Sequence, residues 1–172
     1  PSALLEYSSE SKHAWRLQYA HTVDDPGFYH LYPGTLVSSM HYQHEGNAAL
    51  RPSARDILKL EHSFRPWGNH LSWGISYEQT KAYQQKLYAF SEEGLLTSRM
   101  ENAGRLQEKA VYLSGSWRLG RKLSFSHYTR LRELVSRYDA ALEYAPPNPP
   151  ADLGWETQMA ITGRLPKGIN LS

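Results

Sequence analysis

The chain contains no cysteine, no long apolar run and little net charge. Without cysteine it can hold no disulfide, no Cys-ligated zinc and no thiol nucleophile. No segment approaches the run of about 20 apolar residues that a membrane helix needs. Membrane strands need only about 9–11 residues and alternate in polarity, so this second absence leaves a β-barrel open. The formal net charge of +2 comes from dispersed basic residues, and we expect no nucleic-acid partner.

The length and composition are those of one folded unit. The chain has 172 residues, of which 40% are hydrophobic and 12% aromatic. This is enough apolar material to avoid disorder, and we expect a single β segment over residues 1–172. The chain begins at Pro1 without methionine, and we expect it to be a piece of a longer protein.

Apolar and polar residues alternate with period two in several segments, which is typical of β-strands. In "NHLSWGISYEQ", for example, Leu71, Trp73, Ile75 and Tyr77 alternate with small or polar residues. The same pattern covers residues 13–21, 109–119, 123–131 and 155–165, and less cleanly residues 53–64. The sequence therefore predicts an all-β protein, an antiparallel up-and-down meander of about eight strands.

The connections between these segments alternate strictly between short and long. Short, turn-rich ones occupy residues 8–12, 65–69, 119–122 and 165–168, and long ones occupy residues about 23–52, 80–105 and 133–154. In a meander all short turns then lie at one end, as in outer-membrane barrels. One alternative stays open: Arg130–Tyr144 is rich in Leu, Glu, Arg and Ala, and it suits either a short helix or a continuing strand.

The alternation divides the strands into an apolar and a polar face. The expected membrane-facing set carries no formal charge, as lipid exposure requires, and comprises Leu5, Trp15, Leu17, Tyr19, Leu58, Leu60, Leu71, Trp73, Ile75, Tyr77, Val111, Leu113, Trp117, Leu123, Phe125, Met159 and Ile161. The opposite face contains charged residues such as Arg16, Glu61 and Arg130. A lumen would suit that face, but so would the solvent side of a soluble sheet. Aromatic residues also gather near the short turns, as in an interfacial girdle.

No enzyme signature is present. The eight histidines have no metal-ligand spacing, no calcium-loop pattern occurs, and no G-x-S-x-G or phosphate loop appears. We expect neither catalysis, nor a metal, nor a cofactor. The candidate ligand-binding residues are aromatic and histidine side chains of the long connections, which can stack on sugars or planar chelates: Tyr29, His30, Tyr32, His41, Tyr42, Tyr83 and Tyr88.

Three motifs carry a family resemblance. "GNAALRPS" (46–53) resembles the loop-to-strand motif "GNPxLkPE" of Bacteroidetes-type TonB-dependent outer-membrane receptors, with Ala48 in place of Pro and Ser53 in place of the acid. "MENAGRLQEKA" (100–110) is similar to the family's "NxG" strand, and "ITGRLPKGINLS" (161–172) to its "LPkG" turn. Gly46 and Asn47 would tolerate left-handed backbone angles at the descent into the next strand.

The resemblance implies a fragment of a larger transmembrane β-barrel of about 22 strands in the Gram-negative outer membrane. It implies uptake of a small-molecule nutrient such as a siderophore, cobalamin or a glycan fragment. The implied partners are the lipid bilayer, the TonB system through a plug region that we do not find in this sequence, and a surface lipoprotein. A soluble all-β carbohydrate- or ligand-binding module is the alternative. In that case the apolar face would pack against a second layer.

Overall fold

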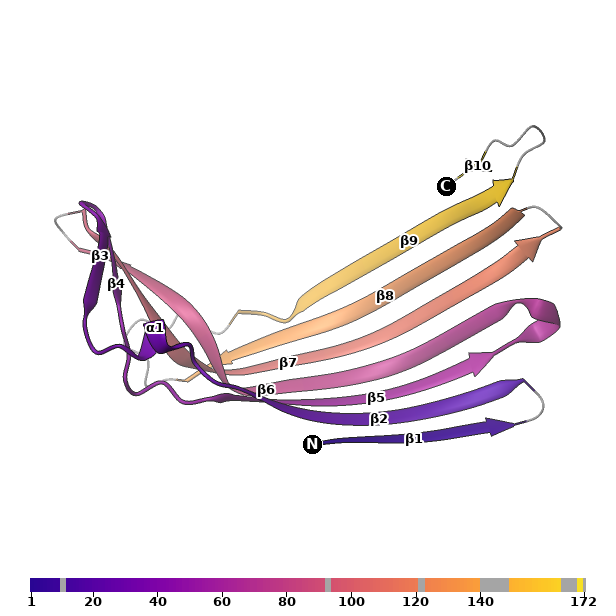
Figure 1. Cartoon of the computed structure of the whole chain (residues 1–172), viewed down its shortest axis with the longest axis horizontal. Coiled ribbons are helices and arrows are strands. Elements are labelled where there is room, and N and C mark those ends of the chain that lie inside the picture. Colours follow the sequence, from indigo (N-terminus) through magenta and orange to yellow (C-terminus); the bar gives the residue numbers. More distant parts are fainter. Residues whose placement is uncertain (10–11, 92–93, 121–122, 140–148, 165–169, 172) are drawn as a thin grey trace.

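The computed structural model is an open, antiparallel β-meander. It describes residues 1–9, 12–91, 94–120, 123–139, 149–164 and 170–171. Consecutive strands on the main path β1-β2-β5-β6-β7-β8-β9-β10 are hydrogen-bonded neighbours, and β3 and β4 lie off this path. Figure 1 shows one curved sheet whose β1 and β9 sides are not joined. The predicted all-β class and meander are confirmed.

The strand bounds follow the alternating segments. They are β1 Ser2–Ser9, β2 His13–Asp24, β3 Thr35–Ser39, β4 Tyr42–Glu45, β5 Ser53–Phe64, β6 His70–Phe90, β7 Leu96–Leu119, β8 Leu123–Tyr138, β9 Asp152–Arg164 and β10 Asn170–Leu171. One helical turn, α1, spans Phe28–Leu31, and a 3-10 turn, η1, spans Pro66–Gly68. In the described part of the chain no helix is long and apolar enough to cross a membrane.

The tight hairpins gather at one end of the sheet and the long connections at the other (Figure 1). The β5–β6 hairpin shows why its turn is short. Pro66 starts η1, and Trp67 and Gly68 adopt φ values of 46° and 78°, a left-handed region that glycine enters without steric cost. The predicted turn at residues 165–168 lies outside the described residues, as do residues 10–11 and 121–122 of the other predicted turns.

One of the expected long loops, residues 80–105, is largely strand. Residues 80–90 belong to β6 and residues 96–105 to β7, and the two strands pair as far as Phe90 and Leu96. The expectation of a loop was wrong because a bulge at Ala82 (φ 51°) interrupts the alternation, and the residues beyond it have no apolar face. Likewise β8 continues to Tyr138, which decides residues 130–138 in favour of strand. Residues 140–144 of that segment lie outside the described part.

Cross-strand register aligns the two faces in rows. One apolar row crosses seven strands through directly paired residues: Leu5, Leu17, Leu60, Ile75, Val111, Leu131 and Trp155. The neighbouring row on the opposite face is Glu6, Arg16, Glu61, Gly74, Tyr112, Arg130 and Glu156. The alternation predicted from the sequence is therefore present in three dimensions.

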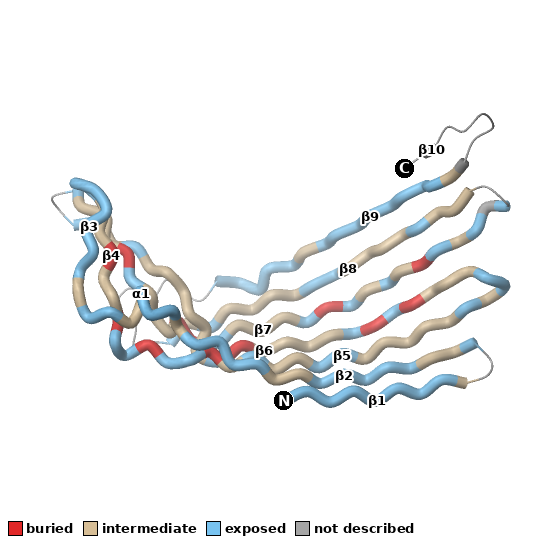
Figure 2. The backbone as a smooth tube through the Cα atoms, in the orientation of Figure 1, coloured by how far each residue is buried: buried red, intermediate tan, exposed pale blue. Residues whose placement is uncertain are grey.

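The apolar face is exposed. Val111 and Leu131 are 54% and 56% exposed although both lie in interior strands, and the buried apolar residues of the described chain are only Leu50, Ala103 and Ala110. Figure 2 shows how few buried positions the sheet contains. A soluble sandwich would bury such a face at about 25 cal/mol per Å², but no described element covers this one. The packing expected for a soluble module is absent from the described structure.

Aromatic rings edge this face near the tight turns. Trp15 and Trp73 meet edge to face at 5.7 Å between ring centroids, and Trp117 stacks on Phe125 at 5.5 Å. From Lys109 to Trp117 the face extends eight residues, about 27 Å along a strand at about 3.4 Å per residue. With a strand tilt of about 40° this corresponds to about 21 Å of depth, close to the apolar band of about 25 Å in outer-membrane barrels.

Candidate functional site

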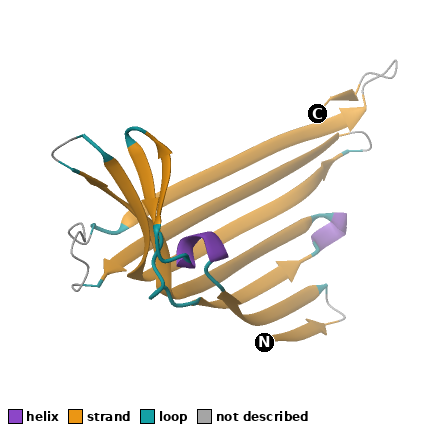
Figure 3. Cartoon of the chain, turned by 60° about the vertical axis from the view of Figure 1, so that its left-hand side comes forward, coloured by secondary structure: helices purple, strands orange, loops and turns teal. Residues whose placement is uncertain are grey.

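The connection between β2 and β5 folds onto the extended β6–β7 hairpin. Within it β3 pairs with β4, and β4 pairs in parallel with β7, with Tyr42 opposite Leu96 and Glu45 opposite Arg99. Together, β3, β4 and the parts of β6 and β7 beyond the bulge at Ala82 form an arm that bends away from the plane of the main sheet (Figure 3). Because β4 pairs with β7, the side chains of the long connection have fixed positions relative to the main sheet.

An aromatic–histidine cluster lies where α1, β4, β6 and β7 meet. Its members are Tyr29, His30, Tyr42, His44, Lys86, Tyr88 and Ser98. The Tyr29 ring stacks on His44 at 4.7 Å, and the rings of His30 and His44 approach with 3.4 Å between Nδ1 and Nε2. The second ring nitrogen of His44, Nδ1, lies 3.1 Å from the Ser98 hydroxyl.

Lys86 completes the other half of the cluster. Its ammonium donates to the Tyr42 hydroxyl at 2.9 Å and lies 5.6 Å from the ring centroids of both Tyr42 and Tyr88, within range of a cation–π interaction. The Tyr42 hydroxyl is also 2.8 Å from Ser98 Oγ. One lysine therefore holds two tyrosine rings in fixed positions.

These contacts shift the pKa values of three side chains in the cluster. Burial, and then the nearby charges of His30 and Lys86, lower the pKa of His44, so this histidine stays neutral at pH 7. The hydrogen bond from Lys86 lowers the pKa of Tyr42, and the same bond raises the pKa of Lys86. The cluster thus presents the firmly held positive charge of Lys86 close to the neutral ring of His44.

The cluster has a buried and an open side. His44 and Ser98 are 1% and 0% exposed, whereas Tyr29 and Tyr88 are 49% and 57% exposed. The buried pair can only support its neighbours, while the open rings can meet a ligand. No group of three metal-ligating side chains occurs among the described residues.

Four of the seven sequence-predicted site residues meet in this cluster: Tyr29, His30, Tyr42 and Tyr88. The other three, Tyr32, His41 and Tyr83, contribute no side chain to it. Tyr32 is half-exposed, and its backbone carbonyl accepts from Gly34 at 2.9 Å. His41 lies at the β3–β4 turn, where its carbonyl accepts from Leu96 at 2.9 Å, and Tyr83 pairs with Gly104 at the β6–β7 bulge.

Sequence reasoning missed Lys86 and Ser98 as site residues and did not select His44 from its loop. Lys86 is two residues from Tyr88 in "KLY", so it lies on the same face of a strand. In a loop, which the sequence predicts for residues 80–105, this spacing does not place two side chains on one face. Nothing local in the sequence marks Ser98, since its partners are more than fifty residues away.

Two of the motifs that carried the resemblance contact each other. The Asn47 amide donates to the Met100 carbonyl at 3.1 Å and to Glu101 Oε2 at 2.8 Å. Asn102 Oδ1 accepts from the Arg51 backbone at 2.8 Å, and its amide donates to the Arg51 carbonyl at 3.0 Å. The loop-to-strand motif is therefore held by the "NxG" strand, which fixes where β5 begins.

The glycines of these motifs allow close backbone approach. A Cβ on Gly46 would overlap the Tyr32 carbonyl oxygen, and one on Gly104 would overlap the Arg137 carbonyl oxygen. Gly104 has φ 129°, but neither Gly46 nor Asn47 has a positive φ. The expected left-handed angles at positions 46 and 47 were wrong, because glycine is required here for space.

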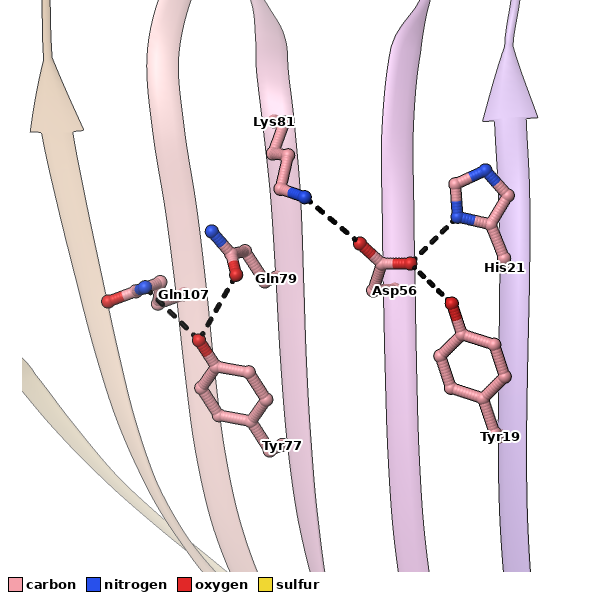
Figure 4. A network of polar contacts seen from close by, with 7 residues as sticks. All are labelled: Tyr19, His21, Asp56, Tyr77, Gln79, Lys81 and Gln107. Atoms are coloured by element: carbon pink, nitrogen blue, oxygen red, sulfur yellow. Dashed lines mark hydrogen bonds and ion pairs between the residues drawn. The ribbon is translucent and has the colours of Figure 1, made fainter.

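A polar network ends the apolar face on the side of the long connections (Figure 4). Asp56 Oδ1 accepts from the Tyr19 hydroxyl at 2.9 Å and lies 2.7 Å from His21 Nδ1. Asp56 Oδ2 lies 3.6 Å from Lys81 Nζ. The tyrosine ring thus faces the apolar rows, while its hydroxyl points toward the long connections.

Tyr77, in the same row as Tyr19, repeats this arrangement. Its hydroxyl donates to Gln79 Oε1 at 3.3 Å and accepts from Gln107 Nε2 at 3.1 Å. Also in this row, Lys109 bonds Glu133 at 2.9 Å, so the face is not free of charge at this end. Tyrosine rings that lie beside the apolar rows, with hydroxyls that form hydrogen bonds on the side of the long connections, are typical of a membrane–water interface.

The comparisons with known proteins agree with this architecture. A search of curated proteins gave no match. The model of the outer membrane protein beta-barrel family matches residues 1–172, which is the entire chain. An exposed apolar face, edged by aromatic rings and charged only at its end, is what outer-membrane localisation requires. The chain therefore belongs to the outer membrane protein beta-barrel family and is a protein of the outer membrane.

Proposed function

We propose that the chain is part of the barrel of a TonB-dependent receptor, and that this receptor takes up a small-molecule nutrient of the siderophore, cobalamin or glycan class. The observation that carries the proposal is the aromatic–histidine cluster, held above the membrane strands on the side of the long connections. Outer-membrane barrels have their long loops on the extracellular side, where a receptor first meets its ligand.

The open rings of Tyr29 and Tyr88 give the site its chemistry. Both are about half exposed, and both are fixed, one by stacking on His44 and one beside Lys86. Fixed aromatic faces bind sugars and planar chelates at low entropic cost. The adjacent ammonium would favour an anionic group, which many chelates carry.

The contact between the Asn47 and Asn102 motifs also supports the proposal. It ties the connection that holds Tyr29 and Tyr42 to β7, so ligand contact at the cluster is mechanically connected to the barrel wall. In the proposed receptor the TonB system would act through a plug region, and a surface lipoprotein would be a further partner.

The test uses the complete outer-membrane protein that contains this chain, expressed in cells with and without a working TonB system. Growth and uptake are measured on a ferric siderophore panel, cyanocobalamin and oligosaccharides. We expect TonB-dependent uptake of one class, reduced about tenfold by Tyr29→Ala together with Tyr88→Ala, at about 0.7 kcal/mol per ring.

The matched control is Phe28→Ala, which removes an exposed ring next to Tyr29 and outside the cluster. Uptake that is independent of TonB for every compound would refute the receptor proposal. Equal losses for the control and the double variant would refute the role of the cluster while leaving the receptor proposal standing.

A further inference from the structure

Three basic residues lie side by side on the lipid-facing side of the sheet. Lys81 on β6 pairs with Arg105 on β7, and Arg105 pairs with Arg137 on β8. Their side is set by alternation from the apolar rows and, for Lys81, by its contact with Asp56 in the network that ends the apolar face (Figure 4). We call these three residues the basic row.

Much of the charge of the basic row is unneutralised. Lys81 approaches Asp56 at 3.6 Å, but neither Arg105 nor Arg137 has an ion-pair partner in the described ranges, and all three residues are exposed. Asp139 lies two residues beyond Arg137 but forms no ion pair with it in the described ranges, and Glu133, four residues before Arg137, already bonds Lys109. Alternation therefore places two guanidinium groups on the outside of the barrel wall, and neither has an ion-pair partner among the described residues.

The basic row lies at headgroup depth. Gln79 and Gln107, which bond the Tyr77 hydroxyl, mark the interface, and Lys81 and Arg105 lie two residues farther along the same strands. Two residues are about 6.8 Å along a strand, or about 5 Å of depth at a tilt of about 40°. The headgroup layer on each side of the hydrocarbon core is about 5–8 Å thick.

Directly below, the apolar face is hollowed. A depression of about 640 Å³ is lined by residues that include Leu58, Leu60, Ile75, Val111 and Leu131, with Lys109 and Glu133 also contributing. This volume lies within the range of about 300–1,000 Å³ of small-molecule sites. Going toward the long connections, the wall thus has an apolar hollow, then amide hydrogen-bonding groups, then uncompensated positive charge.

We propose that this stack is a binding site for one phosphate-bearing, multi-acyl lipid of the outer leaflet. Its acyl chains occupy the hollow, and its phosphate binds Arg105 and Arg137. Arginine binds phosphate oxygens through two parallel N–H groups, and a bilayer lipid is the partner that joins such a headgroup to hydrocarbon at this spacing. The site is independent of nutrient uptake, since it lies on the opposite side of the wall from the lumen.

The test compares two probes on the complete outer-membrane protein purified in detergent. The probes are lipid A and its dephosphorylated form with the same acyl chains, titrated in mixed micelles and counted by native mass spectrometry. We expect lipid A to bind the wild type. The basic-row variant carries Lys81→Gln, Arg105→Gln and Arg137→Gln. We expect it to bind lipid A about a hundredfold more weakly, because each charge near a membrane surface contributes about fivefold.

A control variant removes the same number of charges from the polar face. It carries Arg16→Gln, Lys59→Gln and Arg118→Gln, three exposed positions, and we expect it to bind lipid A like the wild type. Heat-modifiable gel migration identifies folded protein for every variant. If the triple variant does not fold, Arg105→Gln alone is used, with about a fivefold loss expected.

Three results would overturn the proposal. One is equal binding of lipid A and its dephosphorylated form to the wild type. Another is undiminished binding of lipid A to the folded basic-row variant. The third is an equal loss in the polar-face control, which would reduce the effect to net charge.

Discussion

Leu131 offers the sharpest test of which face meets lipid. It lies on β8 within the apolar row, paired with Val111 and Trp155, and it is 56% exposed. A soluble exposed position would accept arginine with a change within about 0.5 kcal/mol. A lipid-facing position would not, because the guanidinium would enter hydrocarbon.

The expected cost follows from depth. The apolar face has its centre in the row of Leu113, and Leu131 lies one row, about 5 Å of depth, from that centre. Arginine at the midplane of an outer-membrane barrel costs about 2–4 kcal/mol, and the cost falls toward the interfaces. We expect Leu131→Arg to lower the free energy of unfolding by about 2–3 kcal/mol, or about 30- to 150-fold in the equilibrium constant.

The measurement is reversible unfolding by denaturant of the complete protein in phospholipid vesicles. Ser126→Arg is the matched control, since Ser126 lies on the same strand, is exposed and belongs to the polar face. We expect this control to stay within about 0.5 kcal/mol of the wild type. Equal costs for the two variants, or a larger cost for Ser126→Arg, would refute the assignment of the faces.

Three further predictions concern the arm, and hydrogen exchange measures each. Gly46→Ala should expose the β4 amides, since its Cβ would overlap the Tyr32 carbonyl, whereas Gly27→Ala, with its nearest neighbour at 3.8 Å, should leave their protection unchanged. Asn102→Ala removes three hydrogen bonds and should reduce the local opening free energy by about 1–3 kcal/mol; unchanged protection of β5's first amides would contradict this. The pKa of His44 is lowered when β4 is paired with β7 (the docked arm). An arm in which this pairing is lost therefore binds more protons. Docking should then be fully stable above pH of about 6.5 and weaken as pH falls below it toward the lowered value, and a His44→Gln variant should lose this dependence.

The alternation of apolar and polar residues predicted most of the fold. It placed Trp73 and Ile75 on one face of the sheet and predicted β5 at residues 53–64. Lipid on one side of the sheet and polar surroundings on the other impose this period of two. The prediction was wrong where the strands no longer face lipid. Beyond Lys81 the β6–β7 hairpin extends out of the bilayer, so "KAYQQKLYAF" has no apolar face and its sequence predicts a loop although it is strand.

The site could be predicted only in part. Tyr29, His30, Tyr42 and Tyr88 are residue types that bind ligands, and their loop positions were enough to select them. Their convergence was not predictable, because it depends on parallel pairing between β4 and β7, a register that no local pattern encodes. Ser98, the buried centre of that pairing, is an ordinary serine in the sequence.

The β4–β7 pairing also sets an order of assembly. Tyr42 lies opposite Leu96, fifty-four residues later in the chain, and the edge that receives β4 does not exist until the β6–β7 hairpin has formed. Contacts this distant along the chain form slowly, because closing the loop between them costs entropy. The β6–β7 hairpin can therefore form while the connection from β2 to β5 is still unattached, and the aromatic–histidine cluster is assembled only after that hairpin is in place.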